Sequence, residues 1–212
     1  PDVTLRFGAS SILHKFRPGS AKGLGEESAF TEITLPDTYA LENGLYLSAE
    51  QSAGRHWRLK YGLRVSTFHN IGKAVVYHYN DNYQVYDSTI YGKGEFYNNY
   101  VAAEPRIALT FIIDTLSSLK ASYSRTAQFI HLAQNSTAGT PLDIWFPSSP
   151  NVHPQLCDQI AVGYFRYFLN DQVETSIEVY YKKINQAIDF KDHASLLLNK
   201  YLEGELRFGT AD

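Results

Sequence analysis

Histidines are the residues of this chain best suited to hold a metal ion or to transfer protons. The seven of them are scattered through the sequence, at His14, His56, His69, His78, His131, His153 and His193. None forms an H-E-x-x-H helix or another tight ligand spacing, so the sequence predicts no metal site and no cofactor. Cys157 is the single cysteine, which rules out an intramolecular disulfide and argues against a thiolate metal site.

Other catalytic patterns find equally little support. Ser124, Ser148 and Ser149 lack a G-x-S-x-G context, which argues against a serine hydrolase. The acidic segment 81–87 lacks the glycine and the terminal glutamate of an EF-hand loop, so we expect a solvated loop there. A glycan-acting enzyme would need two carboxyl groups that converge in space, and the sequence indicates no such pair. We therefore expect no enzymatic activity.

The charged residues with regular spacing alternate with apolar ones. Between residues 57 and 66 the apolar or aromatic positions are Trp57, Leu59, Tyr61, Leu63 and Val65, and the positions between them include Arg58, Lys60 and Arg64. Between residues 173 and 182, Glu174, Glu178 and Lys182 alternate in the same way with Val173, Ile177, Val179 and Tyr181. Because side chains alternate across a strand, each segment predicts one apolar and one charged face.

Two groups of residues are candidates for substrate binding. The first group would line an aqueous lumen and consists of Arg58, Lys60, Arg64, Arg106, Glu174 and Glu178. The alternative for these charges is a solvated face, or cross-strand ion pairs that hold the register. The second group is aromatic and lies in predicted loops: Tyr79, Tyr83, Tyr86 and Trp145. These rings would either stack on a ligand or pack against one another.

Composition narrows the class of protein. The net charge of −3 gives no basic footprint, so we expect no nucleic-acid partner. No run approaches the roughly 18 apolar residues of a transmembrane helix. The chain has 16 Tyr and 12 Phe, a content that fits both outer-membrane barrels and secreted β-sandwiches. It contains no Met and begins at Pro1, and we expect it to be an internal fragment.

Eight strands are predicted, separated alternately by tight turns and long loops. They are Val3–Leu13, Thr38–Gln51, Trp57–Ser66, Val101–Asp114, Leu119–Ile130, Cys157–Leu169, Val173–Phe190 and Leu202–Phe208. Tight turns are expected near 52–55, 115–118 and 170–172, and long loops near 15–36, 69–99, 131–155 and 191–201. A strand of about twelve residues, tilted near 45°, rises roughly 25–30 Å and would cross an outer membrane.

Three positions leave the strand assignment open. Asn43-Gly44 is a strong hairpin signal, but the apolar parity of Leu41 continues through Leu45, which favours one unbroken strand. Pro105 is expected at the beginning of its strand, outside the densest hydrogen bonding. In Cys157–Leu169 either face would suit lipid.

The position of aromatic residues separates a membrane barrel from a soluble sandwich. A barrel places aromatic girdles at the strand ends of its apolar face, whereas a sandwich buries its aromatic rings in mid-strand. Trp57, Tyr39, Tyr123 and Phe165 favour the barrel. The sequence therefore predicts an all-β fold, an antiparallel up-and-down transmembrane β-barrel segment of about eight strands. The alternative is a secreted or surface all-β binding module, such as an adhesin or a carbohydrate-binding sandwich.

Several stretches resemble a known family. They are Glu104-Pro105-Arg106, the run from Leu119 to Thr126, Asp158-Gln159 with the run from Val162 to Phe165, and the run from Val179 to Lys183. They are similar to barrel strands of TonB-dependent outer-membrane receptors of Gram-negative bacteria, which have a 22-stranded barrel closed by an N-terminal plug. The resemblance is a pattern of barrel strands that runs through essentially the whole chain, and neither a plug nor a TonB box is visible.

The resemblance carries expectations about function and partners. It implies energised uptake of a scarce nutrient, whether siderophore, vitamin, glycan or peptide, with this chain forming about a third of the barrel. It implies residence in the bacterial outer membrane, with the tight turns periplasmic and the long loops extracellular. The implied partners are outer-membrane lipid, the receptor's own plug domain, the TonB complex and a surface lipoprotein.

Overall fold

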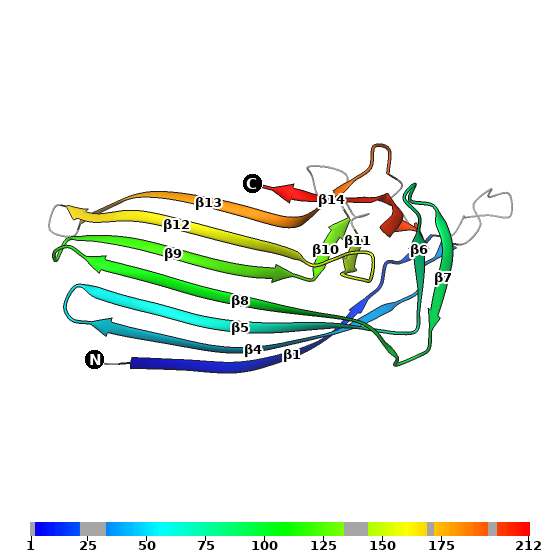
Figure 1. Cartoon of the computed structure of the whole chain (residues 1–212), viewed down its shortest axis with the longest axis horizontal. Coiled ribbons are helices and arrows are strands. Elements are labelled where there is room, and N and C mark those ends of the chain that lie inside the picture. Colours follow the sequence, from blue (N-terminus) through cyan, green and yellow to red (C-terminus); the bar gives the residue numbers. More distant parts are fainter. Residues whose placement is uncertain (1–2, 22–32, 134–143, 169–171, 195–198) are drawn as a thin grey trace.

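The computed structural model describes residues 3–21, 33–133, 144–168, 172–194 and 199–212. Its main element is one antiparallel sheet of eight strands in the order β1-β4-β5-β8-β9-β12-β13-β14, in which each strand pairs with the next long strand along the chain (Figure 1). The strands are β1 Val3–Phe16, β4 Thr38–Ala53, β5 Trp57–Ile71, β8 Phe96–Ile112, β9 Ser117–Gln128, β12 Gln155–Phe168, β13 Val173–Phe190 and β14 Leu206–Ala211. The sheet is open, with β1 and β14 as its outer members. The predicted all-β, up-and-down antiparallel fold is confirmed.

Tight turns join the strands at one end of the sheet, the turn end, on the left of Figure 1. Residues 54–56 connect β4 to β5, and residues 113–116 connect β8 to β9. The opposite end, the loop end, carries the long connections. Most of the turn expected near 170–172 lies outside the described residues, as do parts of the loops expected at 15–36, 131–155 and 191–201.

β4 runs without interruption through Asn43-Gly44. Gly44 lies opposite Ser10 of β1 and Ser66 of β5, in registers that stay unbroken along both ladders. Neither residue has the positive φ that a type I′ hairpin requires. The interpretation of one continuous strand is confirmed, because pairing on both sides overrides the local turn signal.

The two faces of the sheet differ as the alternation predicts. One face, the apolar face, carries Phe7, Ile177 and Val179, which are 79%, 74% and 71% exposed. On β12 the apolar face includes Ile160 and Val162, which pair with Tyr123 and Ala121 of β9. The structure thus settles which face of β12 continues the apolar surface. The other face, the polar face, carries most of the charged side chains.

The prediction that Pro105 begins its strand is wrong. β8 begins at Phe96, and its ladder with β5 continues through Leu63 and Pro105. The ladder of β8 with β9 ends at the pair Arg106 and Ser124. Because proline has no backbone N–H, it interrupts hydrogen bonding on one side of a strand only. The part of β8 that precedes Arg106 therefore has no ladder with β9, although it stays paired with β5.

The last predicted strand is also displaced. Leu202–Glu205 forms a short 3-10 helix, η1, and β14 begins only at Leu206. The amide of Gly204 donates to the carbonyl of Tyr201. A side chain at Gly204 would meet the ring of Tyr79, so this turn fits closely against β6. The alternation of residues 202–208 predicts a strand throughout, but the first four residues form a 3-10 turn, whose period is about three residues and not two.

The long loops, expected to be irregular, contain paired strands. They are β2 Ser20–Ala21 with β3 Ile33–Thr34, β6 Ala74–Tyr79 with β7 Val85–Tyr91, and β10 Ile130–Ala133 with β11 Ile144–Pro147. In Figure 1 the β6–β7 hairpin stands across the right-hand end of the sheet, near β10, β11 and η1. Among the described residues no helix is long and apolar enough to cross a membrane.

Buried apolar side chains form two clusters. The first consists of Phe16, Ala40, Phe68, Ala102 and Phe129, and the second of Ala133, Ile144, Phe146, Val152 and Leu206. Both clusters are built from loop segments and from the strand residues next to them, so they lie at the loop end. The segments of this end thus have small hydrophobic cores of their own.

Candidate ligand-binding surfaces of the polar face and the loop end

Three of the predicted cations surround one hollow of the polar face. Lys60, Arg64 and Arg106 line a space of about 610 Å³ together with Ser48, Ser122, Ser124 and Glu104. Gly62 lies opposite Arg106 in the ladder between β5 and β8 and also lines the hollow. We name this space the cationic hollow.

The sequence builds the hollow through its alternation and one glycine. Lys60 and Arg64 flank Gly62 on β5, so all three positions point to the polar face. A Cβ added to Gly62 would lie 2.9 Å from the carbonyl oxygen of Leu47. The same Cβ would lie 2.8 Å from Ser48 Cβ, so the close approach of β4 requires glycine here.

Arg64 is held in place by neighbouring side chains. Its Nε donates to Ser66 Oγ at 3.0 Å and lies 3.6 Å from Glu104 Oε1. Ser66 Oγ in turn donates to Glu104 Oε1 at 2.5 Å, and Glu104 is only 5% exposed. Arg64 therefore compensates a buried carboxylate. Lys60 and Arg106, both exposed, supply the excess positive charge of the hollow.

The other predicted polar-face residues lie apart from the cationic hollow. Arg58 lies closer to the turn end, opposite Ser52 and Thr110. Glu174 and Glu178 are on β13, several strands away, where Glu178 lies beside Gly163. The structure therefore does not bring the predicted cations and acids into one site.

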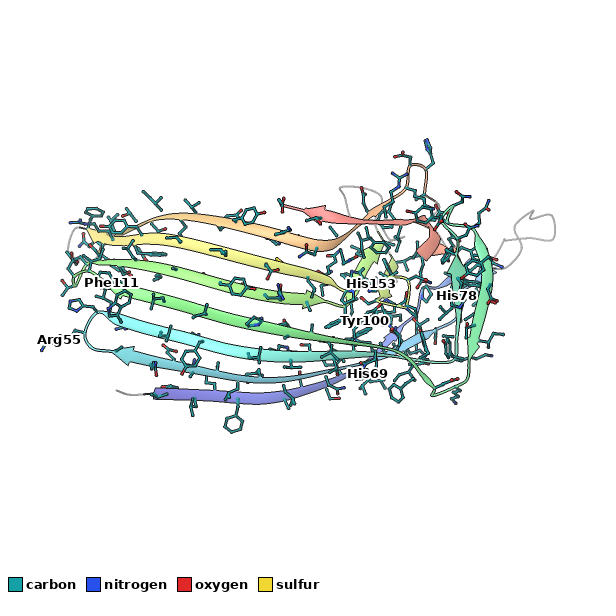
Figure 2. All side chains as sticks on the ribbon, in the orientation of Figure 1. Arg55, His69, His78, Tyr100, Phe111 and His153 are labelled. Atoms are coloured by element: carbon teal, nitrogen blue, oxygen red, sulfur yellow. The ribbon has the colours of Figure 1, made fainter. Side chains whose placement is uncertain are left out.

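Two aromatic residues assigned to girdles at the strand ends lie elsewhere. Phe165 is on the polar face, with Lys120 Nζ 3.8 Å from the centre of its ring. Tyr123 is on the apolar face but in the middle of β9. Trp57, by contrast, lies at the turn end, where its ring packs against Phe111 at a centroid distance of 4.6 Å. In Figure 2, Arg55 and Phe111 mark this end of the sheet.

The four predicted loop aromatics all lie at the loop end but do not converge. Tyr79 has a buried hydroxyl group, and burial raises its pKa well above the ordinary value. Tyr83 lies under Lys191, whose Nζ is 3.6 Å from the ring centre. Tyr86 is largely exposed beside His78. Trp145 lines a pocket, and of the four only Tyr79 is packed into the interior, since Tyr83, Tyr86 and Trp145 are 48%, 69% and 57% exposed.

That pocket, the loop pocket, has a volume of about 220 Å³. It lies where residues of the β1–β4 connection, β6, β11 and the η1 region meet. Its polar and aromatic lining includes Tyr77, Tyr97, Trp145, Lys200 and Glu203. A concave site with a few convergent polar groups is the usual form of a small-molecule site.

A hydrogen-bonded segment, residues 148–153, joins the loops around the pocket, and its residues Ser148, Ser149 and Val152 are buried. Asn151 Nδ2 donates to the Tyr77 carbonyl at 2.9 Å and to Glu203 Oε2 at 2.6 Å. Protein encloses the carboxyl group of Glu203, and this desolvation raises its pKa. Asn151 therefore connects β6 to η1 and orients the acid of the pocket.

The same segment is anchored to the sheet. Asn70 Nδ2 donates to the Ser148 carbonyl at 2.8 Å, and the Tyr100 hydroxyl donates to the Ser149 carbonyl at 2.6 Å. Figure 2 shows Tyr100 and His153 together at this place, where their rings meet edge to face. These bonds hold the β9–β12 connection against strands β5 and β8.

His131 completes the anchor from β10. Its Nε2 lies 2.9 Å from Ser148 Oγ, and the residue is 2% exposed. Burial alone lowers its pKa to about 4, so the ring is neutral at pH 7. Neutral His131 is thus a further hydrogen-bonding partner of the segment 148–153, besides Asn70 and Tyr100.

Sequence reasoning missed the residues that organise these surfaces. Glu104 and Ser66 belong to strands whose parity was identified, but nothing local indicated that they would be buried together. Asn151, Glu203 and His131 come from distant loops, and only the fold brings them close. Among the described residues no group of three or more His, Cys, Asp and Glu side chains has the arrangement of a metal site.

Comparisons with known proteins agree with the architecture. No family model and no curated protein matches the sequence. Among solved structures, the sheet is similar to the ferric-catecholate import receptor Fiu of E. coli K12, in a closed form, with a TM-score of 0.53 and 11% identity. That match covers 92% of this chain and 30% of the receptor.

A second solved structure is the alcaligin outer membrane receptor FauA of Bordetella pertussis. Its TM-score is 0.44 at 16% identity, and the match covers 76% of this chain and 23% of that receptor. The chain thus spans less than a third of either protein. The likeness to Fiu shows that these eight strands share the fold of part of an outer-membrane receptor.

Proposed function

We propose that this chain forms part of the barrel wall of a TonB-dependent outer-membrane receptor that imports a scarce nutrient. The observation that carries the proposal is the exposed apolar face, which runs across the long strands opposite a polar face. A soluble sandwich would cover such a face with a second sheet. The described residues pack no second sheet against it, and it carries Phe7, the most exposed of their large apolar side chains.

Strand length supports the proposal. β12 has 14 residues, which at about 3.3 Å per residue extend about 46 Å. With a tilt near 45° such a strand rises about 33 Å, more than the roughly 25 Å apolar band of an outer-membrane barrel. The polar ends of the strands would then reach both interfaces.

The open edges of the sheet indicate that further strands complete the wall. Among the described residues β1 has β4 as its long partner, and β13 between Val173 and Lys183 pairs with β12 alone. Unpaired backbone groups are not tolerated in hydrocarbon, so closure of the barrel is required. In the proposed receptor these strands belong to the same larger barrel.

The transport path follows from the faces. The polar face would line the lumen beside a plug domain, and the loop end would lie outside the cell, where the loop pocket would take part in capture. The cationic hollow carries three cations against one carboxylate and so favours an anionic group of the substrate. Siderophore, vitamin, glycan and peptide remain the candidate classes. TonB and a surface lipoprotein are the proposed partners, and transport without catalysis is the proposed activity.

The test is the topology in intact Gram-negative cells. Asp81→Cys at the tip of the β6–β7 hairpin and Arg55→Cys in the β4–β5 turn would each be made in a Cys157→Ser background. We expect a membrane-impermeant maleimide to label position 81 on intact cells and position 55 only after the outer membrane is permeabilised. The folded protein should also change its gel mobility on boiling. Equal labelling of both positions on intact cells, or a soluble band indifferent to heat, would contradict the proposal.

A further inference from the structure

The loop pocket contains a carboxyl group that has no cation beside it. Glu203 accepts a hydrogen bond from Asn151 Nδ2 at 2.6 Å, and the side chain of Ser149 is a second hydrogen-bonding partner. Among the described residues no Lys, Arg or His nitrogen lies within ion-pair distance of this carboxyl group. Lys200 lines the same pocket, but its Nζ lies over the ring of Tyr201, 4.8 Å from the ring centre. The acid of the pocket is therefore enclosed without a compensating charge.

The hydrogen bonds of Glu203 do not require its charge. Asn151 and Ser149 both donate to the acid, and the amide oxygen of a glutamine would accept the same two bonds. An enclosed carboxylate is costly unless a cation or a proton neutralises it, and this desolvation raises the pKa of Glu203. A ligand that brings its own positive charge would remove that cost.

The rest of the lining suits an apolar stem. It includes Val76 and Ile144, together with the rings of Tyr77 and Trp145. Aromatic faces attract ammonium groups and also pack against apolar carbons. Tyr77 is held by Tyr201, whose ring it meets edge to face at a centroid distance of 4.9 Å. The aromatic part of the lining is therefore in place before a ligand binds.

The size of the pocket limits what it can hold. Its volume of about 220 Å³ is below the roughly 300 Å³ at which sites for drug-sized molecules begin. The pocket therefore accommodates one side group of a larger substrate. An ammonium group at the end of a short apolar stem matches both the lone acid and the apolar and aromatic walls.

We propose that the loop pocket binds a primary ammonium group carried on an apolar stem, with the ammonium at Glu203 and the stem against the apolar and aromatic lining. The inference rests on the proposed function, in which the loop pocket takes part in capture, and it selects peptides among the candidate substrates. A peptide offers such a group at its amino end and at each lysine side chain. Its carboxylates are the kind of group that the cationic hollow favours.

The test is isothermal titration calorimetry of the detergent-solubilised protein with small amines. Phenethylamine carries the ammonium group on an aromatic stem, and 2-phenylethanol is its uncharged counterpart. Because a hydrogen bond to a charged group is lost, we expect Glu203→Gln to weaken phenethylamine binding about tenfold or more. The weaker binding of 2-phenylethanol should stay unchanged, which also shows that the pocket is intact. Glu205→Gln removes the same charge at a residue of η1 that does not line the pocket, and it should change neither affinity.

A second variant separates the acid from the general charge of the pocket. Lys200→Gln removes a cation from the lining and should not weaken phenethylamine binding. Equal affinities for the amine and the alcohol, no loss in Glu203→Gln, or an equal loss in Lys200→Gln or Glu205→Gln would overturn the site.

Two further ligands identify the source of the ammonium group. Leucine methylamide has only an α-ammonium group, and Nα-acetyl-lysine methylamide has only the one on its side chain. At least one of them should bind with the same dependence on Glu203, and binding of neither would overturn the assignment to peptides. Failure of the proposed function looks different, because positions 81 and 55 would then be labelled alike on intact cells, whatever the pocket binds.

Discussion

The eight-stranded sheet and the loop end are stabilised in different ways. The sheet has exposed apolar side chains on one face and charged ones on the other. Its order comes from long backbone ladders, whose register shifts at Asn70/Ile71 and at Asn185/Ala187. The loop end has buried clusters, aromatic stacking and the hydrogen-bonded segment 148–153. In the proposed membrane the sheet would rely on lipid to cover its apolar face, whereas the loop end carries its own core.

The difference explains where single substitutions should be felt. A side chain on the exposed apolar face has few protein neighbours, so its removal changes little within the chain. A buried side chain of the loop end touches several segments that have no ladder between them. We therefore expect the largest effects where a loop residue contacts the sheet.

The largest effect is expected for Phe129→Ala. The rings of Phe68 and Phe129 are stacked with centroids 5.1 Å apart, and the two residues are 0% and 4% exposed. Removal of a buried Phe ring costs about 3–5 kcal/mol. Because Phe129 begins the β9–β12 connection, the loss should appear as faster amide exchange in residues 129–133 and 144–153 while the long strands stay protected.

The control for Phe129 is Trp145→Ala, a larger aromatic residue of the same connection that is 57% exposed. It should leave exchange in these segments nearly unchanged. If both variants accelerate exchange equally, the first cluster does not anchor the connection. If Phe129→Ala accelerates exchange throughout the sheet, the two regions do not unfold separately.

The next effect is a pH dependence confined to the loop end. The pKa of His131 falls from 6.5 to about 4 on burial, so the unfolded segment binds more protons than the folded one between these values. The stability that His131 contributes should be complete above pH 6.5 and decline as the pH falls, by about 3 kcal/mol at pH 4.

Amide exchange of residues 129–133, compared at pH 7 and pH 4.5 after correction for intrinsic rates, measures this decline. His131→Gln removes the titration but keeps a donor for Ser148, and it should reduce the difference between the two pH values. His78→Gln, on the exposed hairpin, is the matched control and should not. An unchanged difference in His131→Gln would mean that another group titrates.

On the polar face the comparison is between two Glu residues. Glu104→Gln removes the charge that compensates Arg64 and should cost about 1–3 kcal/mol, because the guanidinium group then lies beside a neutral partner. Glu50→Gln breaks an exposed pair with Arg6 at 3.3 Å and should cost less than about 1 kcal/mol. Urea denaturation of the membrane-inserted protein gives both values. Equal costs would show that burial of Glu104 does not strengthen the network.

The sequence predicted those features of the fold that depend on the pattern of neighbouring residues. The strands, their faces and the continuity of β4 follow from alternation, which is a property of neighbouring residues. Pro105 was placed at a strand start because one strand alone does not show that pairing on its two sides can end at different residues. The paired strands in the loops were also not predicted. β6 and β7 are only five residues apart, but they lie in a segment rich in Tyr, Asn, Asp and Gly, a composition typical of a loop.

The candidate binding surfaces likewise have a part that local sequence patterns predict and a part that they do not. Lys60, Arg64 and Arg106 were identified from parity, and they surround one hollow because neighbouring strands place them there. The hydrogen bonds of Glu203 with Asn151 and of His131 with Ser148 depend on which loops meet above the sheet. No spacing within the chain encodes those contacts, so only the assembled fold reveals them.

The smallest effect separates two glycines of the polar face. A Cβ at Gly62 would meet the backbone of β4, 2.9 Å from the Leu47 carbonyl oxygen, whereas a Cβ at Gly8 would meet only the ring of Tyr46. We expect Gly62→Ala to cost about 1–2 kcal/mol because the strands must shift. Gly8→Ala should cost less than about 0.5 kcal/mol, since the tyrosine can turn away and alanine suits a strand better than glycine. The difference in thermal unfolding between the two variants shows whether a clash with the backbone costs more stability on this face than a clash with a side chain. Equal values would mean that β4 and β5 can separate slightly at Gly62, and the shape of the cationic hollow would then depend on its side chains alone.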